Sequence, residues 1–222
     1  MCGRYSLAAD AVMFSKYFNM DTEDLDYTAR YNIAPGQLAP VIVNSGGKGR
    51  LSHMKWGLMP DWLKDRKGGR ALINARAETL YQKPAFRRPF EHRRCLVPAD
   101  GFYEWKKGNG SKTPMRIVLP DAPVFALAGI WDFCTDGRDV RKPSFCIITV
   151  AASKEMESIH PRMPAVLPDI RSMNKWMDTG STTDSLLEML KPYEGGLIIY
   201  PVSTAVNSPL YEGPECIIEV PK

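Results

Sequence analysis

Two apolar stretches decide the fold class: Val124-Phe125-Ala126-Leu127-Ala128-Gly129-Ile130-Trp131 and Phe145-Cys146-Ile147-Ile148-Thr149-Val150-Ala151. Both have the length of a strand, are rich in apolar residues and are bounded by Pro, Asp or Ser, which is typical of buried strands. Six further segments share this pattern: 40–44, 51–58, 94–98, 115–119, 197–202 and 216–220. The sequence therefore predicts a protein built mainly from short strands.

Few segments have the pattern of a helix. The candidates are residues 8–19, 169–178 and 182–191. Val12, Met13 and Tyr17 recur at helical spacing, and Pro168-Asp169 is a typical helix start. Because strands predominate and do not alternate strictly with helices, we expect an α+β fold. The expected architecture is a curved, barrel-like, mostly antiparallel sheet flanked by a few helices, in one domain over residues 1–222.

The composition is that of an ordinary globular protein, with 44% hydrophobic and 24% charged residues. It excludes a disordered chain, a collagen and a coiled coil, and no run approaches the roughly 20 apolar residues of a membrane helix. The five cysteines form no C-x-x-C pair and no signal-like segment precedes them. We therefore expect free thiols in the cytoplasm, near the nucleoid in a bacterium. His53, His92 and His160 lack ligand spacing to these cysteines, so neither a metal nor another cofactor is expected.

The net charge of +4 conceals an uneven distribution. Residues 53–116 contain 15 Lys or Arg against 6 Asp or Glu, so the remainder of the chain is acidic. Aromatic residues such as Trp56, Trp62 and Tyr81 interleave with the basic ones. Basic groups neutralise phosphates and aromatic faces stack on unpaired bases, so the mixture suits single-stranded nucleic acid. The alternative is a solvated charged face above core aromatics.

The chain opens Met1-Cys2-Gly3-Arg4. Initiator methionine is generally removed before a small residue, which would leave Cys2 with a free α-amine beside its thiol. The α-amine has an ordinary pKa of about 7.7–8.0, so part of it is unprotonated near neutrality. Such a 1,2-aminothiol condenses with an aldehyde to an imine, which the thiol closes to a thiazolidine. A chance cysteine in a frayed terminus is the alternative.

Three polar side chains are candidates for acid–base chemistry. Glu104 is a lone acid between Tyr103 and Trp105, a setting suited to proton transfer. His160 lies in a proline-stiffened loop that can present an imidazole, and the amide of Asn74 can both donate and accept. The residues alone leave structural roles open: an ion pair for Glu104, a satisfied His160, and a turn or cap for Asn74.

Six ordered segments carry a family resemblance: Met1-Cys2-Gly3-Arg4, Arg30-Tyr31-Asn32-Ile33-Ala34-Pro35, Trp56-Gly57-Leu58-Met59-Pro60-Asp61-Trp62, Ile73-Asn74-Ala75-Arg76-Ala77-Glu78-Thr79, Ala99-Asp100-Gly101-Phe102-Tyr103-Glu104-Trp105 and Ile159-His160-Pro161-Arg162-Met163-Pro164. Together they resemble the SRAP (SOS response-associated peptidase) family, the abasic-site processing proteins of bacteria and eukaryotes. The resemblance covers nearly the whole chain. It implies the SRAP fold and a lyase-type enzyme that shields abasic sites in single-stranded DNA through a covalent thiazolidine crosslink.

The resemblance also implies a role for each candidate. Cys2 would be the nucleophile, and Asn74 would orient its amine and the adduct. Glu104 would shuttle protons during ring opening and closure, and His160 would protonate or hydrogen-bond the sugar oxygen. Family members are also described as autopeptidases of cysteine type, an activity that here would remove Met1 alone. The family commonly has Asp after the histidine, whereas this chain has Pro161.

A second set of residues would contact the DNA strand. The set is Arg4, Asn32, Trp62, Arg76, Lys83 and Arg87. The resemblance places Trp62 where the family wedges between bases at a single-strand/double-strand junction. The next residue is Leu63, where the family often has a second aromatic, and a leucine stacks poorly. We expect the protein to bind such DNA as a monomer.

Two alternatives remain open. Class II glutamine amidotransferases also begin Met-Cys-Gly, so the chain could be an N-terminal-nucleophile hydrolase acting on glutamine or on peptides, with Asn74 holding the oxygen of a tetrahedral intermediate. A plain single-strand-binding module would explain the basic and aromatic stretch without Cys2. Only a covalent product with abasic DNA separates the crosslinking protein from such a module.

Overall fold

The two apolar stretches form adjacent strands at the centre of the computed structural model, which describes residues 2–20, 26–60, 70–108, 110–135 and 140–221. They are β9 (Phe125–Thr135) and β10 (Arg141–Ala151), which pair antiparallel from Arg141–Thr135 to Ile147–Gly129. Residues 125–130 and 144–150 are buried in continuous runs, as expected for strands covered on both faces. The strand prediction for these stretches is confirmed.

Within the described residues, five strands close into a barrel in the order β10-β4-β3-β6-β9-β10. The additional members are β3 (Leu38–Ser45), β4 (Lys48–Trp56) and β6 (Arg94–Ala99). The β10–β4 pairing is parallel and the other barrel pairings are antiparallel. Gly129 lies opposite Cys95, and a Cβ there would lie 2.8 Å from Cys95 Sγ, which explains the glycine in this tight barrel. The predicted α+β, barrel-like, mostly antiparallel architecture is confirmed.

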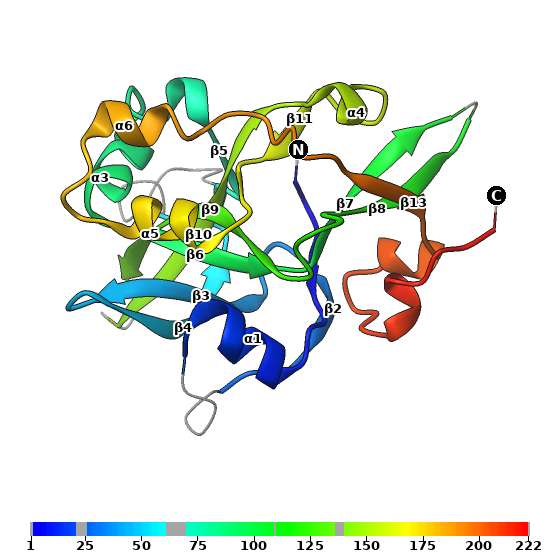
Figure 1. Ribbon diagram of the computed structural model, residues 1–222, viewed down its shortest axis with the longest axis horizontal. Coiled ribbons are helices and arrows are strands. Elements are labelled where there is room, and N and C mark those ends of the chain that lie inside the picture. The colour runs from blue at the N-terminus through cyan, green and yellow to red at the C-terminus, as the bar shows by residue number, and fades with distance from the viewer. Residues whose placement is uncertain (1, 21–25, 61–69, 109, 136–139, 222) are drawn as a thin grey trace.

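A second sheet continues from the barrel in the order β13-β8-β7-β1-β2. Its strands are β1 (Tyr5–Leu7), β2 (Arg30–Ile33), β7 (Gly101–Lys107), β8 (Lys112–Val118) and β13 (Ile198–Pro201). The chain passes from β6 into β7 at Asp100, whose carboxylate accepts from Ser6 Oγ, from the Ala8 N–H and from the Arg116 guanidinium. Figure 1 shows the hairpin of β7 and β8 projecting away from the barrel. This sheet carries the N-terminal strand, and therefore Cys2.

Helices and short strands surround the barrel (Figure 1). The helices are α1 (Ala11–Phe18), α3 (Pro84–His92), α4 (Lys154–Glu157), α5 (Ile170–Met177) and α6 (Thr183–Leu187). The short strands are β5 (Asn74–Arg76), β11 (Arg162–Pro164) and β12 (Val166–Leu167). Short 3-10 helices cover Ala77–Thr79, Thr204–Asn207 and Pro214–Cys216. No helix among the described residues is long and apolar enough to span a membrane.

The element boundaries show where the sequence signals succeed and fail. The side chain of Asp10 caps α1 by accepting from the Met13 N–H, so the helix begins three residues later than predicted. The predicted strand over 216–220 is wrong, because the chain there leaves a 3-10 helix and makes only the isolated bridge Val202–Glu219 in the described residues. The sequence analysis missed α3, which begins at Pro84 and contains Pro89, because proline usually ends helices.

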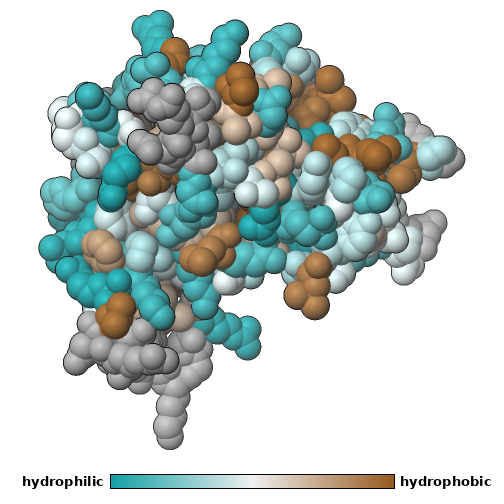
Figure 2. Space-filling view, turned by 90° about the horizontal axis from the view of Figure 1, so that it is seen from below, coloured by the Kyte–Doolittle hydropathy of each residue, from teal (hydrophilic) through white to brown (hydrophobic). Residues whose placement is uncertain are grey.

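Trp56 joins the barrel to the second sheet. It is fully buried in β4, its Nε1–H donates to the Ile73 carbonyl at 2.9 Å, and its ring stacks on Phe145 of β10. The ring of Tyr5 in β1 meets it edge-on at 5.2 Å between centroids. Large hydrophobic side chains also lie at the surface, and from below they form separate brown groups among hydrophilic ones (Figure 2). The main core therefore runs continuously from the barrel to the strand that follows Cys2.

Buried thiols and phenols predict a loss of stability in alkali. Burial raises the pKa of the Cys95 and Cys146 thiols and of the Tyr5 hydroxyl above their ordinary values. Above about pH 9 the unfolded chain loses these protons while the folded chain keeps them, so the free energy of unfolding falls as pH rises, by roughly 1 kcal/mol per pH unit for each group. Urea denaturation across this range measures the slope, which Cys95→Ala should reduce. A flat profile would contradict the prediction.

Candidate functional site

Cys2 lies at the junction of the two sheets. Its side chain is fully buried, and its carbonyl accepts a hydrogen bond of 2.8 Å from Asn74 Nδ2. Asn74 begins β5, which pairs in parallel with β10 at Ile147. On the other side, the Tyr103 N–H of β7 donates to the Arg4 carbonyl at 3.0 Å. The barrel and the second sheet therefore hold the start of the chain from two directions.

Glu104 follows Tyr103 in β7 and is buried, with 4% of its surface exposed. Burial, followed by the negative charge of Glu104, raises the pKa of the Cys2 thiol to about 12. At neutral pH the thiol is therefore protonated while the chain still carries Met1. The structure brings Cys2, Asn74 and Glu104 together, although they lie on three separate segments of the chain.

The two polar atoms of the Asn74 side chain differ in their hydrogen bonding. Its Oδ1 is buried and has no hydrogen-bond partner among the described residues, whereas its Nδ2 is bound to the Cys2 carbonyl. A buried acceptor of this kind costs free energy unless a donor approaches it. The amide can therefore hold the Cys2 backbone with one end and receive a donor with the other.

His160 lies directly before β11, which pairs with the end of β10. Its Nδ1 lies 3.0 Å from the Arg162 backbone nitrogen and 3.1 Å from the Arg162 carbonyl oxygen, and the tautomer with the proton on Nε2 accepts from this N–H. The Arg162 guanidinium donates to Glu78, just after β5, and to the Thr149 carbonyl of β10. These bonds attach the His160 loop to the strand that carries Asn74. The imidazole itself contacts the Arg162 backbone through Nδ1, in a chain that has Pro161 where an Asp was expected.

Arg4 and Asn32, two of the predicted DNA contacts, are buried in the structure. Arg4 is 8% exposed, and its Nη1 donates at 2.6 Å both to Asn32 Oδ1 and to the Val206 carbonyl. Asn32 is fully buried and its Nδ2 donates to the carbonyls of Ser208 and Tyr211. These bonds tie the N-terminal strand to the C-terminal segment, and a contact of either residue with DNA stays a prediction.

Glu212 completes this connection, and the sequence analysis missed it. Its carboxylate accepts from the backbone N–H groups of Tyr31 and Asn32 in β2 and from the Arg30 guanidinium. Glu212 has no recognisable motif around it, so only its contacts identify it. Arg162 and Glu78 were also missed, although both lie in quoted segments, one of them two residues after His160.

The remaining predicted DNA contacts fall into two groups. Arg76 of β5, Lys83 and Arg87 of α3 are exposed, and the Arg87 guanidinium lies 4.7 Å from the ring centroid of Tyr81. Arg76 lies two residues from Asn74, so it flanks the site directly. Trp62 lies outside the described residues, and its role as a wedge stays a prediction.

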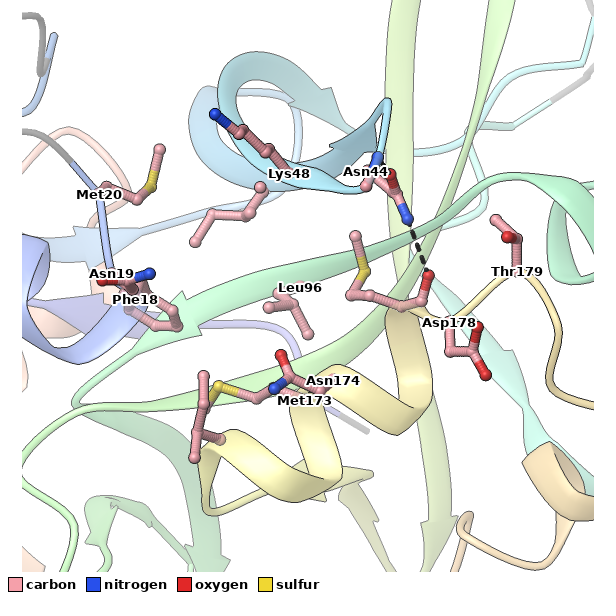
Figure 3. Close-up of a pocket in the computed structure, with 15 residues that line it drawn as sticks. Phe18, Asn19, Met20, Asn44, Lys48, Leu96, Met173, Asn174, Asp178 and Thr179 are labelled. Carbon is pink, nitrogen blue, oxygen red and sulfur yellow. Dashed lines mark hydrogen bonds between the residues drawn. The ribbon is translucent and has the colours of Figure 1, made fainter.

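A large cavity among the described residues lies away from Cys2. It measures about 1010 Å³ between the end of α1, the β3–β4 hairpin and α5. Figure 3 shows Phe18 and Asn19, Asn44 and Lys48, and Met173 and Asn174 around it. Its lining contains none of the predicted catalytic or DNA-contacting residues. Among the described residues there is also no group of three His, Cys, Asp or Glu that could hold a metal.

Comparisons with known proteins identify the family of this chain. The family described as SOS response associated peptidase (SRAP) matches residues 1–209. The abasic site processing protein YoqW of Bacillus subtilis is 40% identical over 222 residues, covering 98% of this chain and 99% of that protein. The abasic site processing protein HMCES of Gallus gallus is 30% identical and covers 87% of this chain and 67% of its own length.

A solved structure agrees as well. The crystal structure of a protein from Bacteroides thetaiotaomicron has a TM-score of 0.85 and 26% identity, and the match covers 99% of this chain and 100% of that one. The similarity of fold therefore extends over both sheets and over the C-terminal segment that meets Arg4 and Asn32.

The placement of Arg4 predicts a stability defect in Arg4→Met. The substitution leaves Asn32 Oδ1 without its donor and leaves the Val206 carbonyl with only the longer bond from Asn32 Nδ2, so we expect a loss of about 2–4 kcal/mol in the free energy of unfolding. Urea denaturation measures the loss. Arg76→Met is the matched control, because Arg76 is exposed and should change stability by less than about 0.5 kcal/mol. Unchanged stability in Arg4→Met, combined with weaker DNA binding, would restore the phosphate contact.

Proposed function

Because the chain belongs to the SOS response associated peptidase (SRAP) family, we propose that it processes abasic sites in single-stranded DNA by forming a covalent bond through Cys2. Its relatives YoqW and HMCES are named abasic site processing proteins. One observation carries the proposal: Asn74 and Glu104, from different sheets and different parts of the chain, meet at the second residue.

The proposed reaction needs no redox partner. After removal of Met1, the Cys2 amine attacks C1 of the ring-opened sugar aldehyde and gives a carbinolamine. Loss of water gives an imine, and the Cys2 sulfur then adds to the imine carbon while its proton passes to the nitrogen. The product is a five-membered thiazolidine, and one water leaves overall. Since the ring forms only from a free α-amine, the other cysteines of the chain cannot substitute for Cys2.

Glu104 is the proposed proton shuttle of this sequence. A raised thiol pKa means that the thiol keeps its proton until a base accepts it, and the Glu104 carboxylate is the negative group whose charge acts on that thiol. The same group would protonate the carbinolamine hydroxyl as water leaves. Asn74 would hold the Cys2 backbone and accept from the amine with its free Oδ1, and His160 would donate its Nε2–H to the sugar oxygen.

Removal of Met1 is part of the proposal. The peptidase in the family name suggests that the same nucleophile releases the residue before it, and here that is a single methionine. The DNA strand would then run past Thr79, Tyr81 and α3. Arg76, Lys83 and Arg87 would bind its phosphates. We propose a monomer acting on one strand, with Trp62 placed against the neighbouring bases.

A denaturing gel tests the crosslink. The protein is incubated with a single-stranded oligonucleotide that contains one abasic site, and a shifted band resistant to denaturation is expected. Cys2→Ala should abolish the band. Glu104→Gln should slow its formation about 100-fold or more, because a general acid–base group typically contributes this much. Cys134→Ala, which removes a partly exposed thiol that has no free amine, is the matched control and should crosslink normally.

Two results would refute the proposal. The first is the absence of a band with a protein whose intact mass shows that Met1 has been lost. The second is a band that persists in Cys2→Ala. Release of ammonia from glutamine, with no crosslink, would favour the N-terminal-nucleophile hydrolase in its place.

A further inference from the structure

Three arginines converge on a small cavity away from Cys2. The cavity measures about 280 Å³. It is lined by Pro60, Pro84, Ala85, Arg88, Pro89, Arg93, Asp132, Phe133 and Arg141. Arg88 comes from α3, Arg93 from the residue after it, and Arg141 from the start of β10. We call this site the arginine pocket.

The charges in the arginine pocket do not cancel. Asp132 forms an ion pair with Arg93 and also accepts from the Phe133 N–H at 2.8 Å. Burial lowers the pKa of Arg93, and the positive charges of Arg88 and Arg141 lower it further, which shows that the three guanidinium groups act on one another. Among the described lining residues, one carboxylate against three guanidinium groups leaves an excess of positive charge, and an anion in the cavity would relieve the repulsion.

Size and lining indicate what kind of anion fits. The cavity lies below the roughly 300–1,000 Å³ of pockets that enclose a drug-sized ligand, so it suits a phosphate group with water better than a nucleoside. Pro84 and Pro89 have no backbone N–H, so donors come from the guanidinium groups, whose fork matches phosphate oxygens. The Arg141 guanidinium lies 4.3 Å from the ring centroid of Phe133, which holds it over an apolar face.

The arginine pocket lies one strand length from the candidate site. Arg141 begins β10, and Thr149 near the other end of β10 pairs with Arg76 of β5. Eight residues of strand span roughly 27 Å, which equals about eight base steps of a stacked strand. The helix α3 carries Arg87 as well as Arg88, and Lys83 directly precedes it, so this element adds further basic groups beside the pocket.

We propose that the arginine pocket binds a phosphodiester of the same DNA strand, about eight nucleotides to one side of the lesion. This proposal rests on the proposed function, because the lesion at Cys2 fixes where the strand begins. It predicts that only one of the two DNA flanks gains affinity when it is lengthened. The pocket would therefore set the strand polarity with which the protein covers an abasic site.

Binding measurements test the proposal. Fluorescence anisotropy is measured with Cys2→Ala protein, which cannot crosslink, and with abasic oligonucleotides lengthened on the 5′ or the 3′ flank beyond about eight nucleotides. One flank should increase both the affinity and the slope of log affinity against log salt. The double variant Arg88→Gln/Arg141→Gln should lose this gain and lower the slope by about 1.4, the value for two phosphate contacts on a single strand.

Matched variants distinguish this site from a general charge effect. Arg171→Gln/Lys175→Gln removes two exposed charges from α5 and should leave the gain in place. Arg141→Lys keeps the charge and should keep the slope. An unchanged slope in the Arg88/Arg141 double variant, or an equal loss on the shortest oligonucleotide, would overturn the proposal. If the wild-type protein forms no crosslink but still gains affinity when one flank is lengthened, the proposed crosslinking is refuted. The proposed phosphodiester site in the arginine pocket is then supported on its own.

Discussion

The hydrogen bond from Asn74 Nδ2 to the Cys2 carbonyl joins β5, a short strand paired with β10 of the barrel, to the first residues of the chain. Most of what we infer about the site depends on this bond, because a chain terminus otherwise frays. β5 can supply the amide only because it pairs with β10, and β10 is fixed by its place in the closed barrel. The position of Cys2 is therefore a consequence of barrel closure.

Two features of the Cys2 environment act on its thiol in the same direction. Burial raises the pKa of the thiol, so that the sulfur is a poor nucleophile at neutral pH, and the charge of the nearby Glu104 carboxylate strengthens that effect. A conventional cysteine nucleophile has a lowered pKa. The site fits a different order of events, in which an amine reacts first and the thiol transfers its proton only as the ring closes. Under this order, a protonated thiol is the starting state that the reaction needs.

The N-terminal strand is also held from the far end of the chain. Arg4 binds Asn32 and the Val206 carbonyl, and Glu212 binds the backbone of β2. This connection joins residues up to about 200 positions apart. In it the buried Arg4 guanidinium has a structural role. The clearest basic surface lies on Arg76, on α3 and in the arginine pocket, all of them exposed or open to a cavity.

The sequence predicts the barrel because its strands are apolar and of uniform length, as in 124–131 and 145–151. It also predicts Cys2, Asn74 and Glu104 as candidates, since each lies in a segment that carries the family resemblance, although their roles stay predictions. Long-range contacts could not be predicted, because no local sequence pattern marks Glu212. Arg4 is a residue type that often contacts DNA, but it is buried like a structural residue. The helix α3 was not predicted because of its two prolines: Pro84 fits the first turn, whereas Pro89 lies inside the helix.

The mass of the crosslinked product tests the central claim most directly. The account predicts that nuclease-trimmed product has the mass of the protein without Met1, plus the sugar fragment, minus one water. It also predicts that borohydride leaves this mass unchanged, because a thiazolidine has no imine to reduce. A product that retains Met1, or one that gains two hydrogens on reduction, would contradict the account.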